Sequence, residues 1–265
     1  MTLRVGVMGA GGRMGQVVCQ AIHDDPELTL AAAIDPYYVG IDLGEVAGSG
    51  LADLGLAVAP RIDELLNAEV DVVVDFTHPD AARENLAFCA ANGVHAVVGT
   101  SGFTEAEYAG IEASFTTSNC LIAPNFAIGA VLMMRFAELA APFFDTAEII
   151  ELHHDGKVDA PSGTAVATAE RMAAASADWT PDPTTSETIA GARGAVGPAG
   201  IPVHSVRMRG MTAHQEVVLG TAGQTLTIRH DSQDRSSFMP GVVLAVKRIG
   251  DLPGLTVGLD RVLDL

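Results

Sequence analysis

The 265-residue chain has few basic residues and, among them, almost no lysine. It carries 15 lysines and arginines against 33 aspartates and glutamates, so its formal net charge is −18. A field of this sign repels polyanions, and we therefore expect neither nucleic acid nor a membrane surface among its partners. An anionic cofactor must then be held by local groups such as backbone N–H donors. Because Lys157 and Lys247 are the only lysines, a lysine inside a motif is not easily explained by chance.

Cysteine and long apolar runs are scarce too. The three cysteines lie far apart in the sequence, which argues against a disulfide framework or a zinc site and suits a reducing cytoplasm. Residues 1–12 do not place a charged region before a long apolar run, so we expect no signal peptide. The most apolar long stretch, 127–144, is interrupted by Arg135, Glu138 and Pro142 and is not expected to span a membrane.

The first half of the chain alternates strand-like and helical patterns. The apolar strand-like runs are residues 3–8, 28–34, 70–75, 94–98 and 120–123, and the helical patterns are 12–22, 80–91 and 104–114. Strands that alternate with helices predict an α/β fold, with a doubly wound parallel sheet covered by helices on both faces.

The second half has a different pattern. It contains helical patterns at 128–140 and 163–177, β-type runs at 147–153, 203–208, 215–219 and 224–230, and a loop rich in Pro, Gly, Ser and Thr at 181–200. Turn residues separate its last strands, which predicts an α+β domain with a mixed sheet. A final helical pattern at 237–249 suits a return to the first domain. With about 100–200 residues in a typical domain, we predict two: 1–125 with 235–265, and 126–234.

A glycine-rich turn, GAGGRMG at residues 9–15, follows the first strand and opens the first helix. Its glycines have the spacing GxGGxxG and not the strict GxGxxG. Such a turn lets the backbone approach a pyrophosphate, which the N–H groups at the helix start then bind. Asp35 ends the second strand, where a carboxylate accepts hydrogen bonds from ribose hydroxyls. The predicted cofactor contacts here are Gly9, Ala10, Gly11, Gly12, Arg13, Met14 and Asp35.

The turn, helix and terminal aspartate together predict a dinucleotide-binding domain at 1–125 with 235–265. A flavodoxin-like turn for a non-nucleotide ligand is the alternative. Two further loops, 75–79 and 98–103, follow parallel strands at the edge where such sheets bind ligands. Phe76, Thr77 and the hydroxyl residues of the second loop suit contacts with ribose and nicotinamide, although each loop alone is also compatible with an ordinary turn or helix cap.

The richest chemistry lies in residues 151–164, which read ELHHDGKVDAPSGT. His153 and His154 end an apolar strand, Lys157 follows, and a turn then opens a helix at Gly163. Imidazole moves protons near neutral pH, and lysine offers an anionic substrate a positive charge or a proton. The N–H groups at a helix start suit a carboxylate. This string therefore predicts a proton-transfer site in a substrate-binding domain at 126–234.

Two plainer interpretations of the string are possible. A pair of histidines alone is also compatible with surface residues of a loop, but the lysine and the helix start beside it favour a site. A metal centre is not expected, because HHxxK lacks the HExxH spacing and has no third ligand nearby.

The sequence resembles the dihydrodipicolinate reductase family over essentially its whole length. Residues 151–164 match that family's signature E-x-H-H-x-x-K-x-D-A-P-S-G-T, which is highly specific, and the turn at 9–15 is similar to its GAxGRMG turn. Residues 75–77, 99–103 and 123–129 also resemble family segments, in the same order.

The resemblance implies an NAD(P)H-dependent reductase of lysine and diaminopimelate biosynthesis. Its substrate would be the cyclic dicarboxylate 4-hydroxy-tetrahydrodipicolinate, which is reduced to tetrahydrodipicolinate with loss of water, in a cytoplasmic homotetramer formed through the second domain's sheet. His153 is implied as proton donor or acceptor and Lys157 as second proton donor. The substrate-binding residues implied are His154, Lys157, Ser162, Gly163 and Thr164, and the further cofactor contacts are Gly99, Thr100, Ser101, Ala123, Pro124, Asn125 and Phe126.

Four positions depart from the family pattern. Ser101 replaces a threonine and keeps the hydroxyl. Asp155 and Gly156 fill positions that are often basic or polar in relatives, and Asp155 lessens the local positive charge. Many members carry a basic residue after the acidic end of the second strand, where it holds a 2′-phosphate, but here that residue is Pro36. We therefore expect NADH to be used at least as well as NADPH; a strong NADPH preference would point to another cation, such as Arg13.

Two other functions are compatible with parts of the sequence. One is a different Rossmann dehydrogenase that acts on an amino or imino acid, such as an aspartate dehydrogenase, which substrate choice would reveal. The other is a non-catalytic cofactor sensor, which would need the glycine turn but leaves His153, His154 and Lys157 unexplained. Cofactor binding without turnover would favour the sensor.

Overall fold

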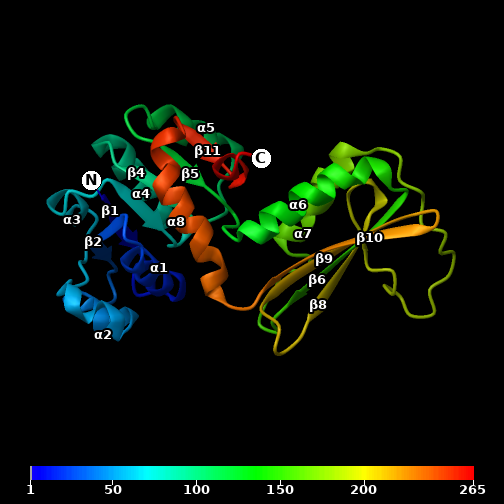
Figure 1. Cartoon of the computed structure of the whole chain (residues 1–265), viewed down its shortest axis with the longest axis horizontal. Helices are drawn as coiled ribbons and strands as arrows, with labels where there is room; N and C mark the ends of the chain where they lie inside the picture. Colours follow the sequence, from blue (N-terminus) through cyan, green and yellow to red (C-terminus); the bar gives the residue numbers. More distant parts are fainter. Residues whose placement is uncertain (1) are drawn as a thin grey trace. The chain divides into compact units, whose positions relative to one another are not determined.

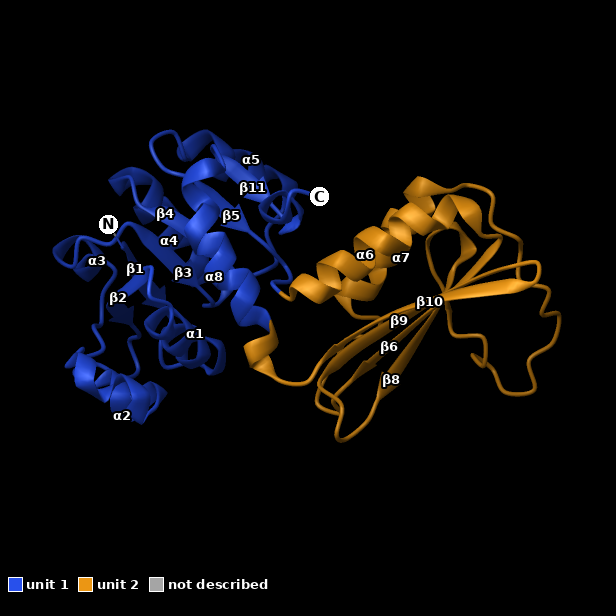
Figure 2. Cartoon of the chain, viewed as in Figure 1, with its two compact units in different colours: residues 1–126, 238–265 blue, residues 127–237 orange. Residues whose placement is uncertain are grey.

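The computed structural model describes residues 2–265, which form two compact units (Figures 1 and 2). One unit comprises the residues up to Phe126 together with Phe238–Leu265, and the other comprises Ala127–Ser237. Each unit has its own sheet and its own buried core. Within residues 2–265, no helix has the length and apolar character that a membrane span requires.

The first unit is built on a six-stranded sheet with the order β11-β5-β4-β3-β1-β2, in which all neighbours are parallel. Its strands are β1 (Leu3–Met8), β2 (Leu28–Ile34), β3 (Val72–Asp75), β4 (His95–Val98), β5 (Cys120–Ile122) and β11 (Leu255–Val257). The order reverses between β1 and β3, and such a reversal opens a crevice at the carboxyl ends of the strands. The predicted doubly wound parallel sheet is confirmed.

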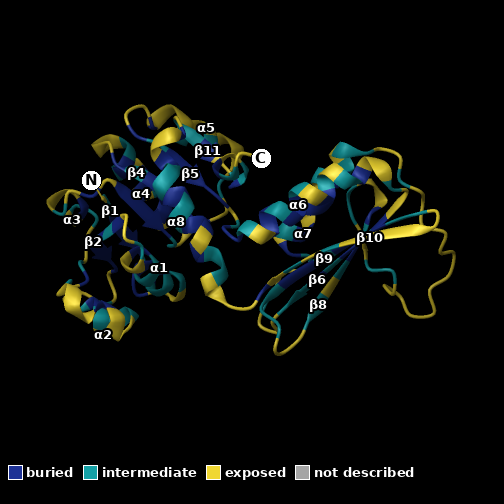
Figure 3. Ribbon diagram, in the orientation of Figure 1, coloured by how far each residue is buried: buried dark blue, intermediate teal, exposed yellow. Residues whose placement is uncertain are grey.

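Helices cover both faces of this sheet. Because crossovers are right-handed and run in opposite directions from the reversal point, helices that follow β1 and β3 lie on opposite faces. α1 (Arg13–Asp24) packs with α8 (Met239–Arg248), whereas α4 (Pro79–Asn92) packs with α5 (Glu105–Ser114). The strands between them are buried along their length (Figure 3), as expected for a sheet covered on both sides.

Local signals explain where these helices begin and end. α4 has Pro79 at its first turn and ends at Gly93, whose φ of 69° is in the left-handed region that glycine adopts without strain. α5 begins with a capping box in which Thr104 and Glu107 satisfy each other's backbone N–H groups. Both helices could therefore be predicted from sequence to within a residue or two.

The second unit holds a five-stranded sheet with the order β10-β9-β6-β8-β7. Its strands are β6 (Thr146–His153), β7 (Ala195–Val196), β8 (Pro202–Arg207), β9 (Ala213–Thr221) and β10 (Gln224–Ser232). β6 and β8 are parallel and the other pairs are antiparallel, so the predicted mixed sheet is confirmed.

Two helices, α6 (Ile128–Ala140) and α7 (Gly163–Ala175), pack with each other and against this sheet (Figure 1). The core between them contains Ile149 from β6, Met172 from α7 and Val217 from β9, all fully buried. Each such side chain contributes roughly 1.5–3 kcal/mol when it is removed from water.

Several short elements were not predicted. In the first unit they are the edge strand β11, the helices α2 (Leu43–Ala47) and α3 (Glu64–Asn67), and the 3-10 turn Ser49–Leu54. In the second unit, the two-residue strand β7 lies inside the predicted loop 181–200. Elements of two to six residues are too short to show a hydrophobic period, and pairing with a longer neighbour decides their conformation.

Candidate active site

The glycine turn after β1 depends on glycine at two positions, Gly9 and Gly15. Gly9 has a φ of 73°, and its carbonyl accepts from the N–H of Gly12 at 2.9 Å. A Cβ added to Gly15 would lie 2.0 Å from the carbonyl oxygen of Gly9. This close approach packs the start of α1 onto the end of β1, and no side chain caps the helix. The first N–H groups of α1 are therefore left for an anionic ligand.

Asp35 fixes this turn from the neighbouring strand. Its carboxylate is 5% exposed and accepts from the N–H of Gly11 at 3.0 Å and from the N–H of Tyr37 at 3.0 Å. The ring of Tyr38 lies over Gly11, because an added Cβ there would be 2.1 Å from a ring carbon. Each carboxylate oxygen has a second lone pair, so these bonds leave Asp35 able to accept a ribose hydroxyl as well.

The first unit contains a cavity of about 480 Å³ and a larger one of about 900 Å³. The larger one opens beside the glycine turn. It brings together six of the residues predicted to contact the cofactor, which are Gly9, Gly11, Gly12, Asp35, Phe76 and Thr77. The uncapped helix start, the glycine backbone and the buried carboxylate fit a dinucleotide, with pyrophosphate at the turn and ribose at Asp35.

The loop after β3 is held by a buried aspartate that sequence analysis passed over. Asp75 is 1% exposed and accepts from the N–H and hydroxyl of Thr77 at 2.8 and 2.6 Å, and from the amide of Asn85 at 2.7 Å. Burial raises the pKa of Asp75, although these hydrogen bonds oppose the shift. Thr100 donates its hydroxyl to the carbonyl of Thr77 at 2.8 Å and so joins the loops after β3 and β4.

Aromatic contacts join the same loops to the segment after β5. A Cβ added to Gly99 would lie 2.0 Å from the ring of Phe76, and the rings of Phe76 and Phe126 have centroids 5.7 Å apart. The ends of three neighbouring strands therefore converge, as the sequence predicted for a ligand-binding edge.

The remaining predicted cofactor residues do not line the larger cavity. Ser101 and Pro124 are exposed, Ala10 and Ala123 are buried, and Met14 and Asn125 are half-buried. Arg13, the first residue of α1, is exposed. Their roles as cofactor contacts stay predictions.

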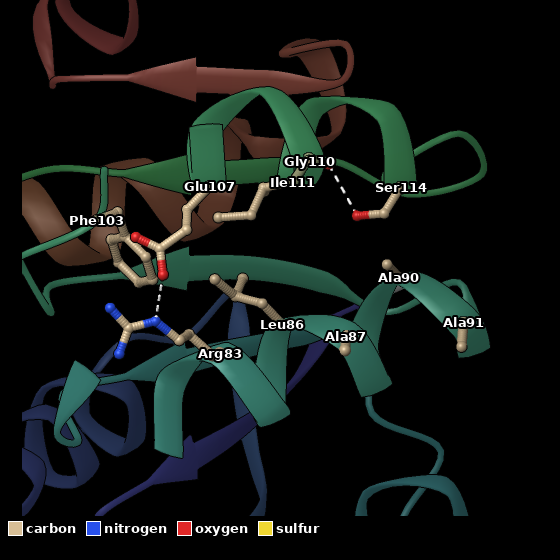
Figure 4. A pocket seen from close by; sticks show the side chains of 10 residues that line it. All are labelled: Arg83, Leu86, Ala87, Ala90, Ala91, Phe103, Glu107, Gly110, Ile111 and Ser114. Atoms are coloured by element: carbon tan, nitrogen blue, oxygen red, sulfur yellow. Dashed lines mark hydrogen bonds and ion pairs between the residues drawn. The ribbon is translucent and has the colours of Figure 1, made fainter. Parts of the chain in front are cut away.

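The smaller cavity lies between α4 and α5 and has a different character (Figure 4). Its lining is mostly apolar or small side chains, and its one ion pair joins Arg83 to Glu107 at 2.5 Å, beside the ring of Phe103. The pair is already satisfied, and the cavity contains none of the predicted site residues. It is therefore not a candidate active site.

In the second unit, the predicted catalytic segment 151–164 begins at the end of β6. His153 is the last residue of the strand, and its side chain is 16% exposed. His154 follows in an exposed position. The chain then turns, with the N–H of Lys157 donating to the carbonyl of His154 at 3.1 Å. This turn places His153 and Lys157 in one compact segment.

A fully buried carboxylate organises the segment. Glu151 lies on the same face of β6 as His153, because side chains two residues apart in a strand share a face. It accepts from both terminal nitrogens of Arg207 at 2.9 and 2.8 Å, from the N–H of Ser162 at 3.2 Å, and contacts Nδ1 of His153 at 2.5 Å. Burial opposes the charge on Glu151, but the bonds from Arg207, Ser205 and His153 outweigh it and lower its pKa.

The charges around His153 act in both directions. Burial lowers the pKa of His153, and Lys157 and Arg207 add to that effect, whereas the hydrogen bond and charge of Glu151 raise it. The net result is a lowered pKa, so the imidazole titrates below its ordinary value of 6.5 when no anionic ligand is near. A bound dicarboxylate would favour the imidazolium, which is the form that donates a proton.

Lys157 is ion-paired within the segment. Its ammonium donates to both carboxylate oxygens of Asp159 at 2.8 Å, and this pairing lowers the pKa of Asp159. The Lys157 side chain is 21% exposed and that of Asp159 is 58% exposed. An anionic substrate can therefore reach the ammonium by displacing the more exposed carboxylate of Asp159.

The start of α7 has the predicted turn, with one residue in an unexpected role. Ser162 is 3% exposed and caps the helix, with its hydroxyl accepting from the N–H of Ala165 at 3.2 Å. Gly163 is exposed and Thr164 is half-buried at the first turn, where the positive end of the helix dipole attracts a carboxylate. The capping bond explains the serine without a substrate contact, so its predicted binding role stays a prediction.

Besides Asp75, sequence analysis missed Arg207, Asn85 and Tyr38, which also shape these sites. Arg207 is 56 positions from Glu151, and Asn85 is ten positions from Asp75; such pairings have no local signal. Tyr38 could have been noticed as an aromatic residue just beyond Asp35. Within residues 2–265, no group of three or more His, Cys, Asp or Glu side chains is arranged to hold a metal ion.

Comparison with known proteins covers both units. Residues 3–126 match a family model described as the N-terminus of dihydrodipicolinate reductase, and residues 129–263 match the model of its C-terminus. A 4-hydroxy-tetrahydrodipicolinate reductase of Corynebacterium urealyticum is 49% identical over 99% of both chains. The enzyme of the same name from Nocardia farcinica is 50% identical over the full length of both.

Solved structures agree with these matches. The dipicolinate-bound dihydrodipicolinate reductase from Paenisporosarcina sp. TG-14 is 40% identical and superposes with a TM-score of 0.87, over 98% of this chain and 99% of that one. An amine dehydrogenase from Mycobacterium smegmatis superposes with a TM-score of 0.68 at 17% identity, over 98% of this chain and 96% of that one. The second likeness concerns the fold alone.

Proposed function

Because the chain belongs to the dihydrodipicolinate reductase family, we propose that it reduces 4-hydroxy-tetrahydrodipicolinate to tetrahydrodipicolinate, in the cytoplasm, as a step of lysine and diaminopimelate biosynthesis. The observation that carries this proposal is the arrangement of His153 and the start of α7 around the buried Glu151, with the charge of Lys157 acting on the His153 ring. It supplies a proton-transfer group, a cation and a helix start to one anionic substrate.

The net reaction adds one hydride and one proton to the substrate and releases water. Reduced nicotinamide dinucleotide, when bound, supplies the hydride. Lys157 serves as second proton donor as the hydroxyl leaves as water, and the carbon beside the hydroxyl gives up a proton in the same elimination. After hydride addition His153 returns one proton to the electron-rich centre that remains, so the net uptake is one hydride and one proton. The substrate carboxylates are held by His154, Lys157, Ser162, Gly163 and Thr164. Positive charge placed where negative charge develops lowers the barrier.

The direct test is oxidation of NADH or NADPH by the purified protein with freshly generated substrate. Wild type should turn over, and the double variant His153→Ala with Lys157→Ala should not. Cofactor binding without turnover would instead support the sensor, and turnover of an amino or imino acid in place of the dicarboxylate would support another dehydrogenase.

For the cofactor, we propose dual use, with NADH at least as good as NADPH. Asp35 is followed by Pro36 at the position where a cation would hold a 2′-phosphate, and the carboxylate of Asp35 is well placed for ribose hydroxyls. Comparing kcat/KM for NADH and NADPH tests this. A strong preference for NADPH would contradict it and direct attention to Arg13 or to Arg61 on the cavity wall.

We also propose that the protein is a homotetramer assembled through the sheet of the second unit. β10 is an edge strand and is exposed over most of its length, with Leu226 38% exposed. An exposed edge strand presents unpaired backbone groups that another chain can pair with. Light scattering after size-exclusion chromatography should give the mass of four chains, and a monomer would contradict the proposal.

A further inference from the structure

Glu151 is bonded to three segments of the second unit at once, although its side chain is fully buried. It contacts the His153 ring on its own strand, the N–H of Ser162 at the start of α7, and the guanidinium of Arg207 on β8. A buried carboxylate is costly unless it is paired and hydrogen-bonded. The four bonds meet that requirement, and they also place the carboxylate between the predicted proton donor and the predicted carboxylate-binding turn.

The contact between Glu151 and His153 fixes the protonation pattern of the ring. The pKa of Glu151 is lowered, so its carboxylate is ionised at neutral pH and can only accept. Nδ1 of His153 must therefore carry the hydrogen in this contact. In the neutral ring Nε2 is then the unprotonated nitrogen, and in the charged ring it is the nitrogen whose proton can be given to a ligand.

Arg207 keeps this arrangement ionic. It donates two bonds to Glu151 and a third to the carbonyl of Asp159 at 2.7 Å, so it also holds the turn that follows Lys157. With Arg207 in place, Glu151 stays ionised next to His153. The positive charge of Arg207 also lowers the pKa of His153, so the ring is not locked as a permanent ion pair.

We propose that Glu151, neutralised by Arg207, is a positioning residue for proton transfer: it holds His153 in the Nδ1-protonated tautomer with Nε2 available to the substrate, and ties that ring to the start of α7. This inference rests on the proposed function of His153. It assigns to Glu151 and Arg207 a shared role in the reaction that neither performs by touching the substrate.

A merely structural ion pair would behave differently. Removing either partner would then affect stability, and the His153 ring would keep its tautomer and its titration. A positioning pair predicts that loss of the Glu151 charge changes the tautomer of His153, and that the pKa of His153 shifts in opposite directions when Glu151 or Arg207 is neutralised. The charged groups that act on the ring are Glu151 on its own strand, Lys157 in the following turn and Arg207 on β8, so each can be varied separately.

The first experiment is nitrogen-15 NMR of the full protein with labelled histidine, with His153 assigned by its absence from a His153→Gln variant. Wild type should show the Nδ1-protonated tautomer. In Glu151→Gln the ring should become a mixture of tautomers and its pKa should fall, because the negative charge that favours imidazolium is gone. In Arg207→Gln the pKa of His153 should rise, because a nearby positive charge is gone.

The second experiment is the pH dependence of kcat/KM. His153 must be protonated to donate, so activity is lost as the pH rises above its pKa. This loss should move to lower pH in Glu151→Gln and to higher pH in Arg207→Gln. At its optimum, Glu151→Gln should retain roughly 1% of wild-type kcat/KM, within the range that a positioned acid contributes.

The matched control is Glu148→Gln. Glu148 lies on the same strand and also bonds an arginine and a histidine, Arg193 at 2.5 Å and His204 at 2.6 Å, but on the other face of the sheet. This variant should leave the His153 spectrum and the pH profile unchanged.

The outcomes separate the two proposals. An Nε2-protonated His153 in wild type, or an unchanged ring in Glu151→Gln, overturns the positioning role even if the enzyme is active. If Glu151→Gln does not fold, the wild-type tautomer and the Arg207→Gln titration still decide. Absence of wild-type turnover, with His153 behaving as described, overturns the proposed function and not the geometry.

Discussion

The glycine turn of the first unit and the histidine–lysine segment of the second are held in place by opposite means. At residues 9–15 the backbone forms hydrogen bonds with itself and with the buried carboxylate of Asp35. Its glycines let neighbouring atoms come so close that a Cβ atom would clash with them. At residues 151–164 the backbone is an ordinary strand and turn, and charged side chains fix the geometry through Glu151 and Arg207.

This difference teaches what each region can tolerate. The turn depends on volume, so it should be sensitive to a single methyl group and indifferent to moderate changes of pH. The segment depends on charge, so it should be sensitive to neutralisation and to pH while accepting side chains of similar size.

The largest expected effect is the loss of activity when a charge is removed from the segment 151–164. Lys157→Met keeps most of the length of the side chain and removes its charge and its proton, and it should lower kcat/KM roughly 100- to 1,000-fold. The matched control is Lys247→Met, which removes the other lysine, bound to Asp25 at 2.8 Å. Lys247 also pairs with Glu27. These ion pairs lie at the partly exposed surface, where each is worth about 1 kcal/mol or less, so the control should keep its activity. Equal losses in both variants would show that lysine charge acts on the fold and not on the site.

The next effect is that of volume in the first region. Gly15→Ala forces a methyl group against the carbonyl of Gly9 and should destabilise the protein by roughly 1–3 kcal/mol while weakening cofactor binding. Gly110→Ala on α5 meets nothing within 4 Å and should stabilise the protein by up to about 1 kcal/mol. Urea unfolding and cofactor titration measure both; a harmless Gly15→Ala would contradict the close approach.

A smaller effect is the pH dependence of stability that His153 gives to the second unit. The folded-state pKa of His153 is depressed below 6.5, so the unfolded chain binds a proton first as the pH falls, and stability is lost from about pH 6.5 downward. The loss is at most about 1.4 kcal/mol per pH unit for one group. Between pH 7 and 5, wild type should therefore lose more unfolding free energy than His153→Gln. An identical slope in the two proteins would argue that the ring is not depressed.

The smallest effect concerns the cavity beside the glycine turn. Arg61 and Asp63 line it as an exposed ion pair, with Nε of Arg61 donating to Asp63 at 3.0 Å. Asp63→Asn would release the guanidinium for a 2′-phosphate and should raise NADPH affinity relative to NADH by up to about fivefold, the strength of such a surface pair. Arg61→Ala should shift the ratio the other way. No movement in either variant would exclude this cation from the 2′-phosphate.

Much of this organisation could be predicted from sequence, and the exceptions have physical causes. The alternation of strands and helices predicts the parallel sheet of the first unit. The string at 151–164 predicts the proton-transfer site of the second unit from sequence alone. The partner of Glu151 could not be found, because β6 and β8 become neighbours only through tertiary pairing. Ser162 has a structural reason for its place in the motif, because its hydroxyl caps α7, and its predicted contact with substrate stays a prediction. Strand β11 has three residues, too few for a period, and exists because β5 offers it an edge.

The second unit is an insertion between Phe126 and Phe238, and this has a consequence for synthesis of the chain. α8 packs beside α1, and an added Cβ on Gly241 would touch the carbonyl of Phe126. The cofactor-binding sheet therefore lacks a covering helix and its edge strand β11 until residues 238–265 have been synthesised. Domains usually complete folding from the N-terminus onward, but here the first unit is completed after the second. Removal of residues 238–265 should thus expose the first half of the chain to aggregation, although the segment with His153 lies far upstream of the cut.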